Sequence, residues 1–536
     1  MTTPSRGSYC SVDANAHFSN QNQSPESPAT PIKERQNMLS HLVDPASSDE
    51  AQMAAARYFR KVLSRPNSTR SCISDLLGHQ PLVPALIKGL NRSRLPELQL
   101  DCAWAITNLA CGDCAQTHKL VESGAVPALM QVANSCPPGE LRDQAIWALS
   151  NISGDCASCK SKVINHGFLR FAVRIVIELA NAHLDVLEQQ NRSKDEQDGT
   201  LDDSGLLNAA STDPAITQSL HTAVWSLSNA CRGRNHHADY AQLTPVLPTL
   251  CRLITMRHLL AQDLVADTLW ALAYMANGTV PQIQGVLDTG ITSELIECMS
   301  SNNERVMTGA LRAIGNLITG SDAQTEYVLD RGALDALNHL ASHHKRDVRR
   351  EVAWTLSNVT AGTPDQIQQV LDNDELMCKL VDILFQDQTK VRKEAAWTLV
   401  NALSGGSPDQ RVRMCDWGAL SWLPYMMRVD TWRRDDRLML AMLAAVRAFC
   451  DALRDTNMHD MKRMLRHHSL HVALTELFDG DDSIADSVRD EARDIHNEFC
   501  APEPQQPSNN TQQQAPTRKV IVIHFTDREM KSLSSM

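Results

Sequence analysis

The sequence lacks the marks of secreted, membrane-spanning and disulfide-linked proteins. Its 536 residues contain no run of about 18 apolar residues, so we expect no membrane span. The first residues are polar, and we therefore expect no secretory signal peptide. The 15 cysteines are odd in number and form no regular framework, which is typical of reduced proteins inside the cell. Aromatic residues make up only 4% of the chain, while leucine and alanine dominate its periodic segments, as in stacked helices.

Signatures of catalysis and of nucleic-acid binding are also missing. The chain has no phosphate-binding loop, nucleophile elbow or pair of carboxylates in a context suited to catalysis, so we expect neither an enzyme nor a cofactor. The formal net charge is −12, and an acidic surface repels nucleic acid and attracts cationic partners. We therefore expect no direct binding to nucleic acid.

Two closely spaced cysteine pairs raise the alternative of a metal site. Cys111 and Cys114 form one pair and Cys156 and Cys159 the other, so four thiols could meet around a zinc ion. Pairs with this spacing also arise by chance in a chain with 15 cysteines, and the histidine doublets show no ligand spacing to one another. We therefore predict no metal site, a prediction that a zinc assay would test.

The chain does contain a recurring pair, a tryptophan followed four residues later by an asparagine. Residues four apart on a helix share one face, so each pair presents a flat ring beside an amide. The five complete pairs are Trp104 and Asn108, Trp147 and Asn151, Trp225 and Asn229, Trp354 and Asn358, and Trp397 and Asn401. Two degenerate copies stand between the third and fourth pairs: Trp270 with Tyr274, and Arg312 with Asn316. We call these positions the ladder.

The spacing of the ladder predicts the architecture. Its first members, from Trp104 to Trp397, follow one another after 43, 78, 45, 42, 42 and 43 residues. A period in the forties with helical patterning alone is typical of armadillo or HEAT repeats, which stack into a solenoid with a concave binding face. In each repeat a loop containing glycine precedes one helix, and a second helix carries the ladder pair. We expect the glycines after the second helix, such as Gly112 and Gly362, to be left-handed caps.

Composition divides the chain into three parts. Residues 1–46 and 501–536 are rich in polar residues and proline, and we predict that both segments are disordered. Residues 47–500 carry the helical pattern and form the predicted solenoid. The long step of 78 residues contains an insert at about 182–214 that is rich in acidic residues and turn formers, so we predict an acidic surface loop there.

Repeated tryptophan and asparagine side chains suit an extended basic peptide. The apolar stem of a lysine or arginine can lie between neighbouring rings, and amides can bond both the N–H and the C=O groups of a peptide. Acids near the rings would then select positive charge, and four are present: Asp155, Asp267, Glu351 and Glu394. Two other interpretations stay open, tryptophans that belong to the core and asparagines that stack on one another inside the solenoid.

These residues closely resemble importin alpha, the armadillo-repeat adaptor for nuclear localisation signals. The similarity covers roughly residues 50–500 and includes the irregular copies, because the family has a tyrosine and an arginine where Tyr274 and Arg312 stand here. The resemblance implies an all-α, right-handed armadillo-repeat solenoid of about ten repeats. It also implies a protein of the cytoplasm and nucleus that binds basic nuclear localisation signals for nuclear protein import.

The resemblance further implies two peptide-binding sites. The major site comprises Trp104, Asn108, Gly112, Thr117, Trp147, Asn151, Asp155, Trp225, Asn229 and Asp267. The minor site comprises Tyr274, Arg312, Asn316, Thr325, Glu351, Trp354, Asn358, Glu394, Trp397 and Asn401. In the major site, Asp155 would be the salt-bridge partner of the key lysine of the ligand. In the minor site, Arg312 would offer its guanidinium to backbone carbonyls or to a helix end of the ligand.

The chain departs from the family in its first residues. Family members carry a strongly basic N-terminal segment that binds importin beta and folds back over the cargo groove, whereas residues 1–46 contain only Arg6, Lys33 and Arg35 as basic residues. Importin beta therefore does not follow as a partner from the resemblance. The repeats that meet the export receptor in the family are weakly patterned here, which leaves that partner open. The alternative function is an armadillo scaffold or cargo chaperone that binds other extended partners without importin beta.

Overall fold

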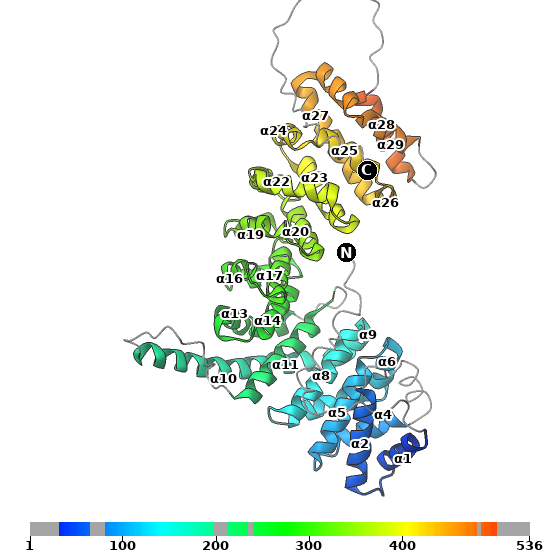
Figure 1. The fold of residues 1–536 in the computed structure, drawn as a ribbon, viewed down its shortest axis with the longest axis vertical. Coiled ribbons are helices and arrows are strands. Elements are labelled where there is room, and N and C mark those ends of the chain that lie inside the picture. Colours follow the sequence, from blue (N-terminus) through cyan, green and yellow to red (C-terminus); the bar gives the residue numbers. More distant parts are fainter. Residues whose placement is uncertain (1–31, 65–80, 198–212, 234–239, 480–483, 501–536) are drawn as a thin grey trace, which may run out of the picture. The chain divides into compact units, whose positions relative to one another are not determined.

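The structure is a computed structural model that describes residues 32–64, 81–197, 213–233, 240–479 and 484–500. Within these ranges all regular structure is helical and no strand occurs, which confirms the all-α prediction (Figure 1). The helices belong to two units, Met1–Leu317 and Ile318–Met536, which we describe in turn. None of the helices in the described ranges combines the length and the apolar character that spanning a bilayer requires.

Unit 1 is built on a row of helices that pack in chain order. Its helices are α1 (Ile32–Val43), α2 (Asp49–Leu63), α4 (Leu82–Leu90), α5 (Pro96–Ala110), α6 (Cys114–Glu122), α7 (Ala125–Ser135), α8 (Glu140–Asp155), α9 (Ala157–Asn165), α10 (Phe168–Gln197), α11 (Pro214–Cys231), α12 (Tyr240–Leu243), α13 (Leu247–Thr255), α14 (Gln262–Met275), α15 (Val280–Leu287), α16 (Thr292–Cys298) and α17 (Glu304–Leu317). Helices α2, α5, α8, α11, α14 and α17 each pack on the next in that order. All of these helices except α2 carry a ladder pair.

Unit 2 continues the same pattern. Its helices are α18 (Asp322–Leu329), α19 (Ala333–Leu340), α20 (Arg346–Val359), α21 (Pro364–Leu371), α22 (Asp374–Gln386), α23 (Thr389–Gly405), α24 (Pro408–Arg413), α25 (Ala419–Met427), α26 (Asp430–Arg433), α27 (Asp436–His467), α28 (Leu470–Phe478) and α29 (Asp486–Ile495). Here α20 packs on α23 and α23 on α27. Helices α20 and α23 carry the last two ladder pairs.

A repeat consists of three helices and not of the two that the sequence suggested. Helices α18, α19 and α20 form one repeat, and α21, α22 and α23 form the next. The first helix is short, with eight residues in both α18 and α21. Its apolar pattern therefore covers barely two turns, which is too little for a periodicity argument to detect. We call the last helix of each repeat, which bears the ladder pair, its third helix.

A capping box starts most of the short first helices and explains the glycine before them. In α21, the Thr363 hydroxyl accepts from the backbone N–H of Gln366, whose side chain accepts from the backbone N–H of Thr363. The same box begins α6, α15, α18 and α24. A Cβ atom at Gly362 would lie 1.9 Å from the Gln366 Oε1 atom, and one at Gly112 would lie 1.8 Å from that of Gln116. These glycines therefore make room for the box, and the prediction of left-handed caps was wrong for them.

Two predicted boundaries need correction. Helix α1 lies inside segment 1–46, predicted to be disordered, and it buries Leu39 and Leu42 while packing on α2 and α4. The rest of that prediction, for residues 1–31, and the prediction for the tail at 501–536 lie outside the described residues. The insert predicted as a loop at 182–214 is helical as far as Gln197, where α10 ends after 30 residues. Residues 198–212 of the insert lie outside the described residues.

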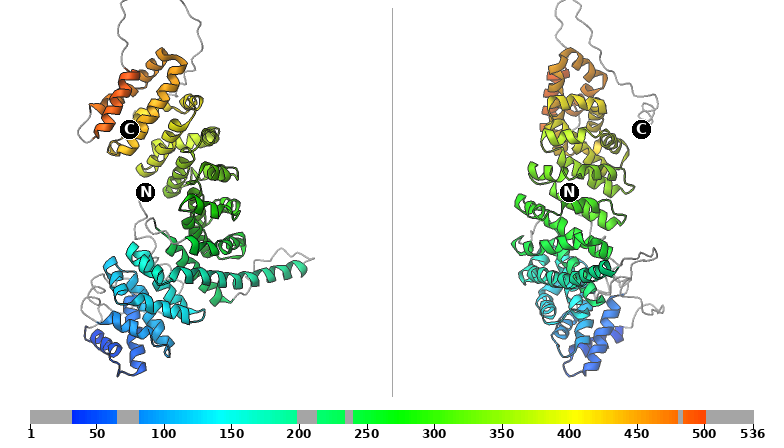
Figure 2. Two further views of the ribbon diagram at one scale, coloured as in Figure 1. Left: turned by 180° about the vertical axis from the view of Figure 1, so that it is seen from behind. Right: turned by 90° about the vertical axis from the view of Figure 1, so that its left-hand side faces the viewer.

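Helix α10 extends beyond its neighbours, as two views of the chain show (Figures 1 and 2). Its acidic residues Asp185 and Glu188 accept hydrogen bonds from the Arg252 guanidinium on α13 at 2.9 and 2.7 Å. These ion pairs connect this part of α10 to α13, and such a contact from a distant segment favours the helix there. These two acids are therefore already engaged and do not reach toward a basic ligand.

Candidate functional site

The tryptophans of the major site lie half-exposed on successive third helices of unit 1. Trp104 is on α5, Trp147 on α8 and Trp225 on α11. The rings of Trp147 and Trp225 touch edge to face, with centroids 5.8 Å apart, and the Arg60 guanidinium lies 4.0 Å above the ring of Trp104. A ligand stem therefore does not fit between Trp147 and Trp225 as they stand, and it would lie on their outer faces unless one ring turned.

Five of the six ladder asparagines bond to the preceding helix of the row, whereas the buried Nδ2 atom of Asn358 has no hydrogen-bond partner in the part of the chain that the structure describes. Asn401 Nδ2 donates to the backbone oxygen of Ser357 at 2.8 Å, and Asn316 Nδ2 donates to that of Ala273 at 2.7 Å. In both cases the acceptor is the residue just before the equivalent ladder position one repeat earlier. The remaining bonds of this kind in the described residues join Asn151 to Thr107, Asn229 to the hydroxyl of Ser150, and Asn108 to the hydroxyl of Ser64. Asparagine–asparagine stacking, which the sequence left open, is not how these amides are used.

Gly112, Thr117 and Asp155 converge where α6 meets the end of α8. Thr117 is fully buried, and its hydroxyl donates to the Asp113 backbone oxygen at 3.2 Å. Asp155 is the last residue of α8 and is half-buried. Gly112 stands directly before the capping box of α6. The resemblance placed these three residues around one lysine pocket, and the structure brings two of their elements, α6 and α8, into contact.

Asp267 has a different environment from Asp155. Its side chain on α14 is buried, with a relative exposure of 4%, and both oxygens are engaged. Arg305 on α17 donates to Oδ1 at 3.0 Å, and His221 on α11 pairs with Oδ2 at 2.9 Å. This carboxylate therefore ties three third helices together, and it would act on a ligand only if Arg305 or His221 moved away.

The minor-site residues of unit 2 differ in their burial. Trp354 on α20 is 7% exposed and Glu351 is 9% exposed, whereas Trp397 on α23 is half-exposed and has the Arg437 guanidinium 5.6 Å from its ring centroid. Burial raises the pKa of Glu394 above its ordinary value, an effect that outweighs nearby Arg350 and Lys393. Asn358, like Asn401, is half-buried.

Of four further minor-site residues, Tyr274, Arg312 and Asn316 belong to unit 1 and Thr325 belongs to unit 2. In unit 1, the rings of Trp270 and Tyr274 lie 5.6 Å apart, Arg312 is half-buried and Asn316 is buried at 5% exposure. In unit 2, the hydroxyl of buried Thr325 donates to the Ile318 backbone oxygen at 3.0 Å. Each of these side chains therefore contributes to packing in its own unit.

One residue that shapes the site gave no signal in the sequence. Lys160 on α9 is buried, and its ammonium donates at 3.2 Å to the backbone oxygens of both Asn229 and Ala230, and also to that of Arg232. It thereby satisfies the open carbonyls at the end of α11, just after the Trp225 pair. Burial lowers the pKa of Lys160 to about 8. A single lysine some 70 residues from its acceptors shows no local pattern.

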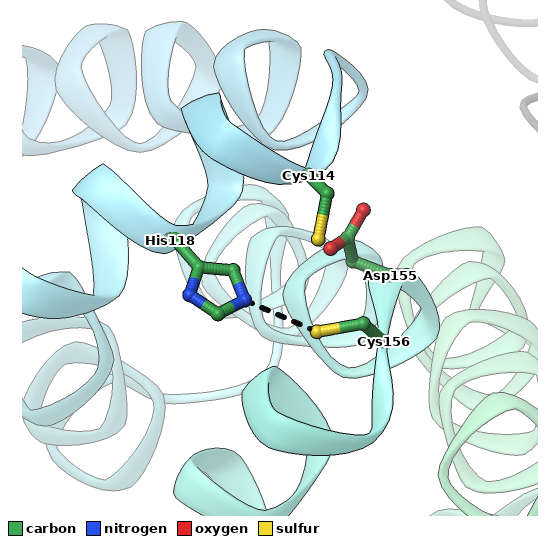
Figure 3. Close-up of side chains that lie close together, drawn as sticks. All are labelled: Cys114, His118, Asp155 and Cys156. Atoms are coloured by element: carbon green, nitrogen blue, oxygen red, sulfur yellow. Dashed lines mark hydrogen bonds between the residues drawn. The ribbon is translucent and has the colours of Figure 1, made fainter.

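A cluster of four potential metal ligands lies beside the major site. Cys114 and His118 come from α6, and Asp155 and Cys156 from the junction of α8 and α9, and the four side chains point toward one another (Figure 3). One ligand atom from each residue lies within 4.8 Å of the others, and His118 Nε2 is 3.3 Å from Cys156 Sγ. Of the two cysteine pairs seen in the sequence, each therefore contributes one member. Cys111 instead contacts Asn151, and Cys159 is buried beneath Cys156.

The pKa values in this cluster reflect its concentration of acidic groups. A hydrogen bond to Asp155, together with burial and the Cys156 thiol, raises the pKa of Cys114 to about 11. Burial acts to raise the pKa of Cys156, but hydrogen bonds from the Cys159 backbone N–H and from His118 outweigh it and lower that pKa. The hydrogen bond to Cys156 in turn raises the pKa of His118.

Comparisons with known proteins agree with this repeat architecture. A family model for the HEAT-like repeat matches residues 96–152, and one for the Armadillo/beta-catenin-like repeat matches residues 321–361. Importin subunit alpha-1b of Oryza sativa subsp. japonica is 34% identical over 287 residues, which are 53% of this chain and 46% of that protein. Importin subunit alpha-2 of Arabidopsis thaliana is 35% identical over 278 residues, 52% and 44% of the two chains. The chain is an armadillo-repeat relative of the importin alpha subunits.

This importin alpha relative matches a little less than half the length of those curated proteins. A crystal structure of an engineered protein aligns with 87% of this chain and 98% of its own, with a TM-score of 0.66 and 21% sequence identity. At that identity the match concerns the fold alone. The predictions of an all-α armadillo fold and of a relation to importin alpha are confirmed, while the assignment of individual ladder residues to a ligand stays a prediction.

Proposed function

We propose that this importin alpha relative binds basic nuclear localisation signals in extended form along the ladder, as an adaptor for nuclear protein import. The observation that supports this most directly is the row of half-exposed tryptophans, each with an asparagine one turn later, on consecutive third helices of unit 1. The sequence similarity to importin alpha subunits supports the same function. On this proposal the protein works in the cytoplasm and the nucleus.

The contacts at the ladder favour the major site as the stronger of the two. Trp104, Trp147 and Trp225 are all half-exposed, whereas Trp354 in the minor site is buried. A ring must expose a face to attract a cation or to cover its apolar stem, so a buried tryptophan contributes less. We therefore propose that a basic peptide binds unit 1 first.

The asparagines can hold a peptide while they hold the repeats. A side-chain amide has two N–H donors and an accepting oxygen. The bond from Asn401 to the preceding repeat uses one donor. The Asn151 amide nitrogen donates to both Thr107 and the Cys111 sulfur and keeps its oxygen for a ligand. The polar atoms that remain can then bond the backbone of an extended ligand without reading its sequence. Sequence selection on this proposal comes from the ring faces and from the Asp155 carboxylate.

The proposal is tested by fluorescence anisotropy with a lysine-rich nuclear-localisation peptide and the purified chain. We expect binding in the micromolar range or tighter, and we expect Trp147→Ala to weaken it at least about tenfold, because tenfold corresponds to about 1.4 kcal/mol, within the range of a partly desolvated cation–ring contact. Trp417→Ala is the matched control, since Trp417 is also half-exposed and lies beside a guanidinium, that of Arg413, but stands outside the ladder. Equal affinities for the wild type and Trp147→Ala would refute the site.

The alternative function is an armadillo scaffold or cargo chaperone that acts without importin beta. It is favoured by one observation, the presence of only three basic residues in segment 1–46. Size-exclusion chromatography of the chain with a basic cargo and importin beta separates the two functions. A ternary complex supports the import adaptor, whereas a cargo complex that leaves importin beta free supports the chaperone. Recovery of acidic or apolar segments in place of basic ones would support the scaffold.

A further inference from the structure

The side chains of Cys114, His118, Asp155 and Cys156 form a ligand set that suits one class of ion. Two sulfurs, an imidazole nitrogen and a carboxylate oxygen are all ligands that zinc accepts, and four protein ligands are the number in structural zinc sites. Soft thiolates disfavour magnesium and calcium, which prefer oxygen ligands. The chemistry of the set therefore points to zinc or a metal of similar softness.

The distances within the cluster are close to those that a tetrahedral site needs. Zinc bonds of about 2.3 Å to sulfur and about 2.0 Å to nitrogen place neighbouring ligand atoms roughly 3.5–3.8 Å apart. His118 Nε2 and Cys156 Sγ are already 3.3 Å apart, and no pair of the four atoms exceeds 4.8 Å. The upper limit of 4.8 Å exceeds the tetrahedral separation by about 1 Å, a shift that changes of side-chain rotamer can supply. All four residues are half-buried, so an ion can enter from solvent.

The backbone holds these four residues in place independently of any ion. Cys114 and His118 stand four apart on α6 and so share one face. Cys156 caps the start of α9, where its sulfur accepts from the Cys159 backbone N–H. Equivalent short helices begin with Asp113, Thr279, Ser321, Thr363 and Ser407. A cysteine in this capping position is thus peculiar to α9 among these six helix starts, and it brings its sulfur toward α6.

We propose that Cys114, His118, Asp155 and Cys156 constitute a zinc site that links the first helix of one repeat, α6, to the junction of α8 and α9. Three of its ligands are anionic when bound to the ion, so a divalent cation offsets the repulsion that their proximity creates. The ion joins adjacent repeats as a cross-link. The proposal differs from the sequence analysis, which considered the two cysteine pairs together and predicted no metal site.

The site has a consequence that rests on the proposed function. Asp155 is the carboxylate expected to meet the key lysine of a basic peptide, and it cannot serve lysine and zinc equally well. We therefore infer that zinc lowers the affinity for a basic peptide at the major site by at least tenfold. Loss of zinc would release the carboxylate for the peptide.

The first experiment uses cobalt(II) as an optical probe on the full chain, stripped of metal with a chelator and kept reduced. We expect one equivalent of cobalt to bind with the visible bands of a tetrahedral site and with thiolate-to-cobalt charge transfer, and we expect zinc to displace it. The double variant Cys114→Ser with Cys156→Ser should lose these bands. Serine is also a good helix cap, so the second change keeps the start of α9. No tetrahedral bands in the wild type, or unchanged bands in the double variant, would overturn the proposal.

Controls separate the site from general cysteine chemistry and from misfolding. Cys136→Ser with Cys378→Ser removes two accessible cysteines elsewhere and should keep the cobalt spectrum. If Cys114→Ser with Cys156→Ser changes the circular dichroism of the metal-free chain, His118→Gln with Asp155→Asn replaces it, and that pair should weaken cobalt binding at least about tenfold. A disulfide between Cys114 and Cys156 that forms readily, with no cobalt binding after reduction, would show a redox pair in place of a metal site.

Peptide binding is measured with and without one equivalent of zinc. A cobalt spectrum without any peptide binding would leave the zinc site standing and remove the proposed function. Peptide binding without a cobalt spectrum would do the reverse. If the chain binds both cobalt and the peptide, and zinc does not change the affinity for the peptide, then only the proposed competition at Asp155 is overturned.

Discussion

A ladder asparagine can both bond the preceding repeat and, on the proposed function, bond a ligand. A leucine at the same position could do neither. The bond of the asparagine to the preceding repeat, as from Asn401 to Ser357, is a second bond to a backbone oxygen that also accepts from the Thr360 hydroxyl, and it links the two helices. The remaining polar atoms of the amide face the ligand on the proposed function. Stability and binding are thus joined in one side chain.

Sequence reasoning at this scale located the positions but not the partners. The spacing of four residues put ring and amide on one face, and the half-exposure of Trp147 and Asn151 agrees with that. The sequence could not predict that Arg305 and His221 pair with the Asp267 carboxylate, since those residues lie 38 and 46 positions away. Nor could it choose Cys114 over Cys111 as a neighbour of Cys156, because that choice depends on how α6 begins.

Asp143 gives a prediction about pH at the residue scale. Its carboxylate on α8 accepts from the Ser219 hydroxyl at 2.7 Å, and burial raises its pKa to about 6, against the opposing effects of Ser219 and Arg142. The unfolded chain releases this proton near pH 3.9, so the native state binds the extra proton between about pH 4 and 6. The contribution of this group to stability is therefore present at low pH and is lost as the pH rises through that window.

Asp143→Asn mimics the protonated side chain and should remove that loss. We expect the variant to be more stable than the wild type at pH 8 by about 1–3 kcal/mol, and we expect the difference to vanish below about pH 4. Thermal midpoints followed by circular dichroism across this range would check it. Asp382→Asn, at an exposed position on α22, is the control and should show no such pH dependence. A constant gain at every pH would contradict the argument.

At the scale of the element, the capping boxes fix where each repeat starts. The Gln366 side chain accepts from Thr363 and also donates to the Asp322 backbone oxygen at 2.7 Å, so one box both starts α21 and contacts the previous repeat. The sequence shows this box as a glycine, then a Ser, Thr or Asp, and a glutamine three residues after that. That pattern could have revealed the missing first helices had it been read as a capping box.

Two glycine substitutions should have opposite effects on stability. Gly362→Ala puts a Cβ atom 1.9 Å from Gln366 Oε1, and the displaced side chain loses both of its bonds, at a cost of about 1–3 kcal/mol. Gly154→Ala in the last turn of α8 meets nothing within 4 Å and should stabilise by about 0.5–1 kcal/mol. The shifts in the thermal midpoint would show the two signs. A gain at Gly362 would mean that the box is not holding the repeat.

The sequence predicted the long third helices but not the helical part of the insert. Long third helices such as α20 and α23 followed from their periodicity, because 14 and 17 residues give several turns of pattern. The acidic insert was assigned to a loop, since its charges and turn formers disfavour a helix locally. The structure extends α10 through Asp185 and Glu188, and Arg252 of α13 pairs with both acids, which is a tertiary contact that composition cannot show.

For the whole chain, stability should be local, because third helices pack mainly on their neighbours in the row. Helix α23, for example, packs on α20, α22 and α27. Leu399→Ala on α23 removes a side chain that is 1% exposed and should cost about 2–5 kcal/mol. In repeat arrays such a loss spreads only to nearest neighbours.

Hydrogen exchange followed by mass spectrometry would measure this locality. We expect Leu399→Ala to speed exchange in α20, α23 and α27 and to leave α5 and α8 at wild-type rates. Leu149→Ala, equally buried on α8, is the matched counterpart and should do the opposite. Uniform acceleration along the chain in either variant would show that the array unfolds as one cooperative body.

Asn151, Asn316 and Asn401 each bond the backbone oxygen of the residue just before the preceding ladder position, and this bears on how such chains change length. Gain or loss of one complete repeat recreates the same bond across the new junction, since donor and acceptor keep their phase. An insertion of any other length breaks it unless it leaves the third helices untouched, as the extension of α10 does between Trp147 and Trp225. Repeat number, and with it the length of peptide that can be held, is therefore open to evolution by duplication without redesign of the surfaces in between.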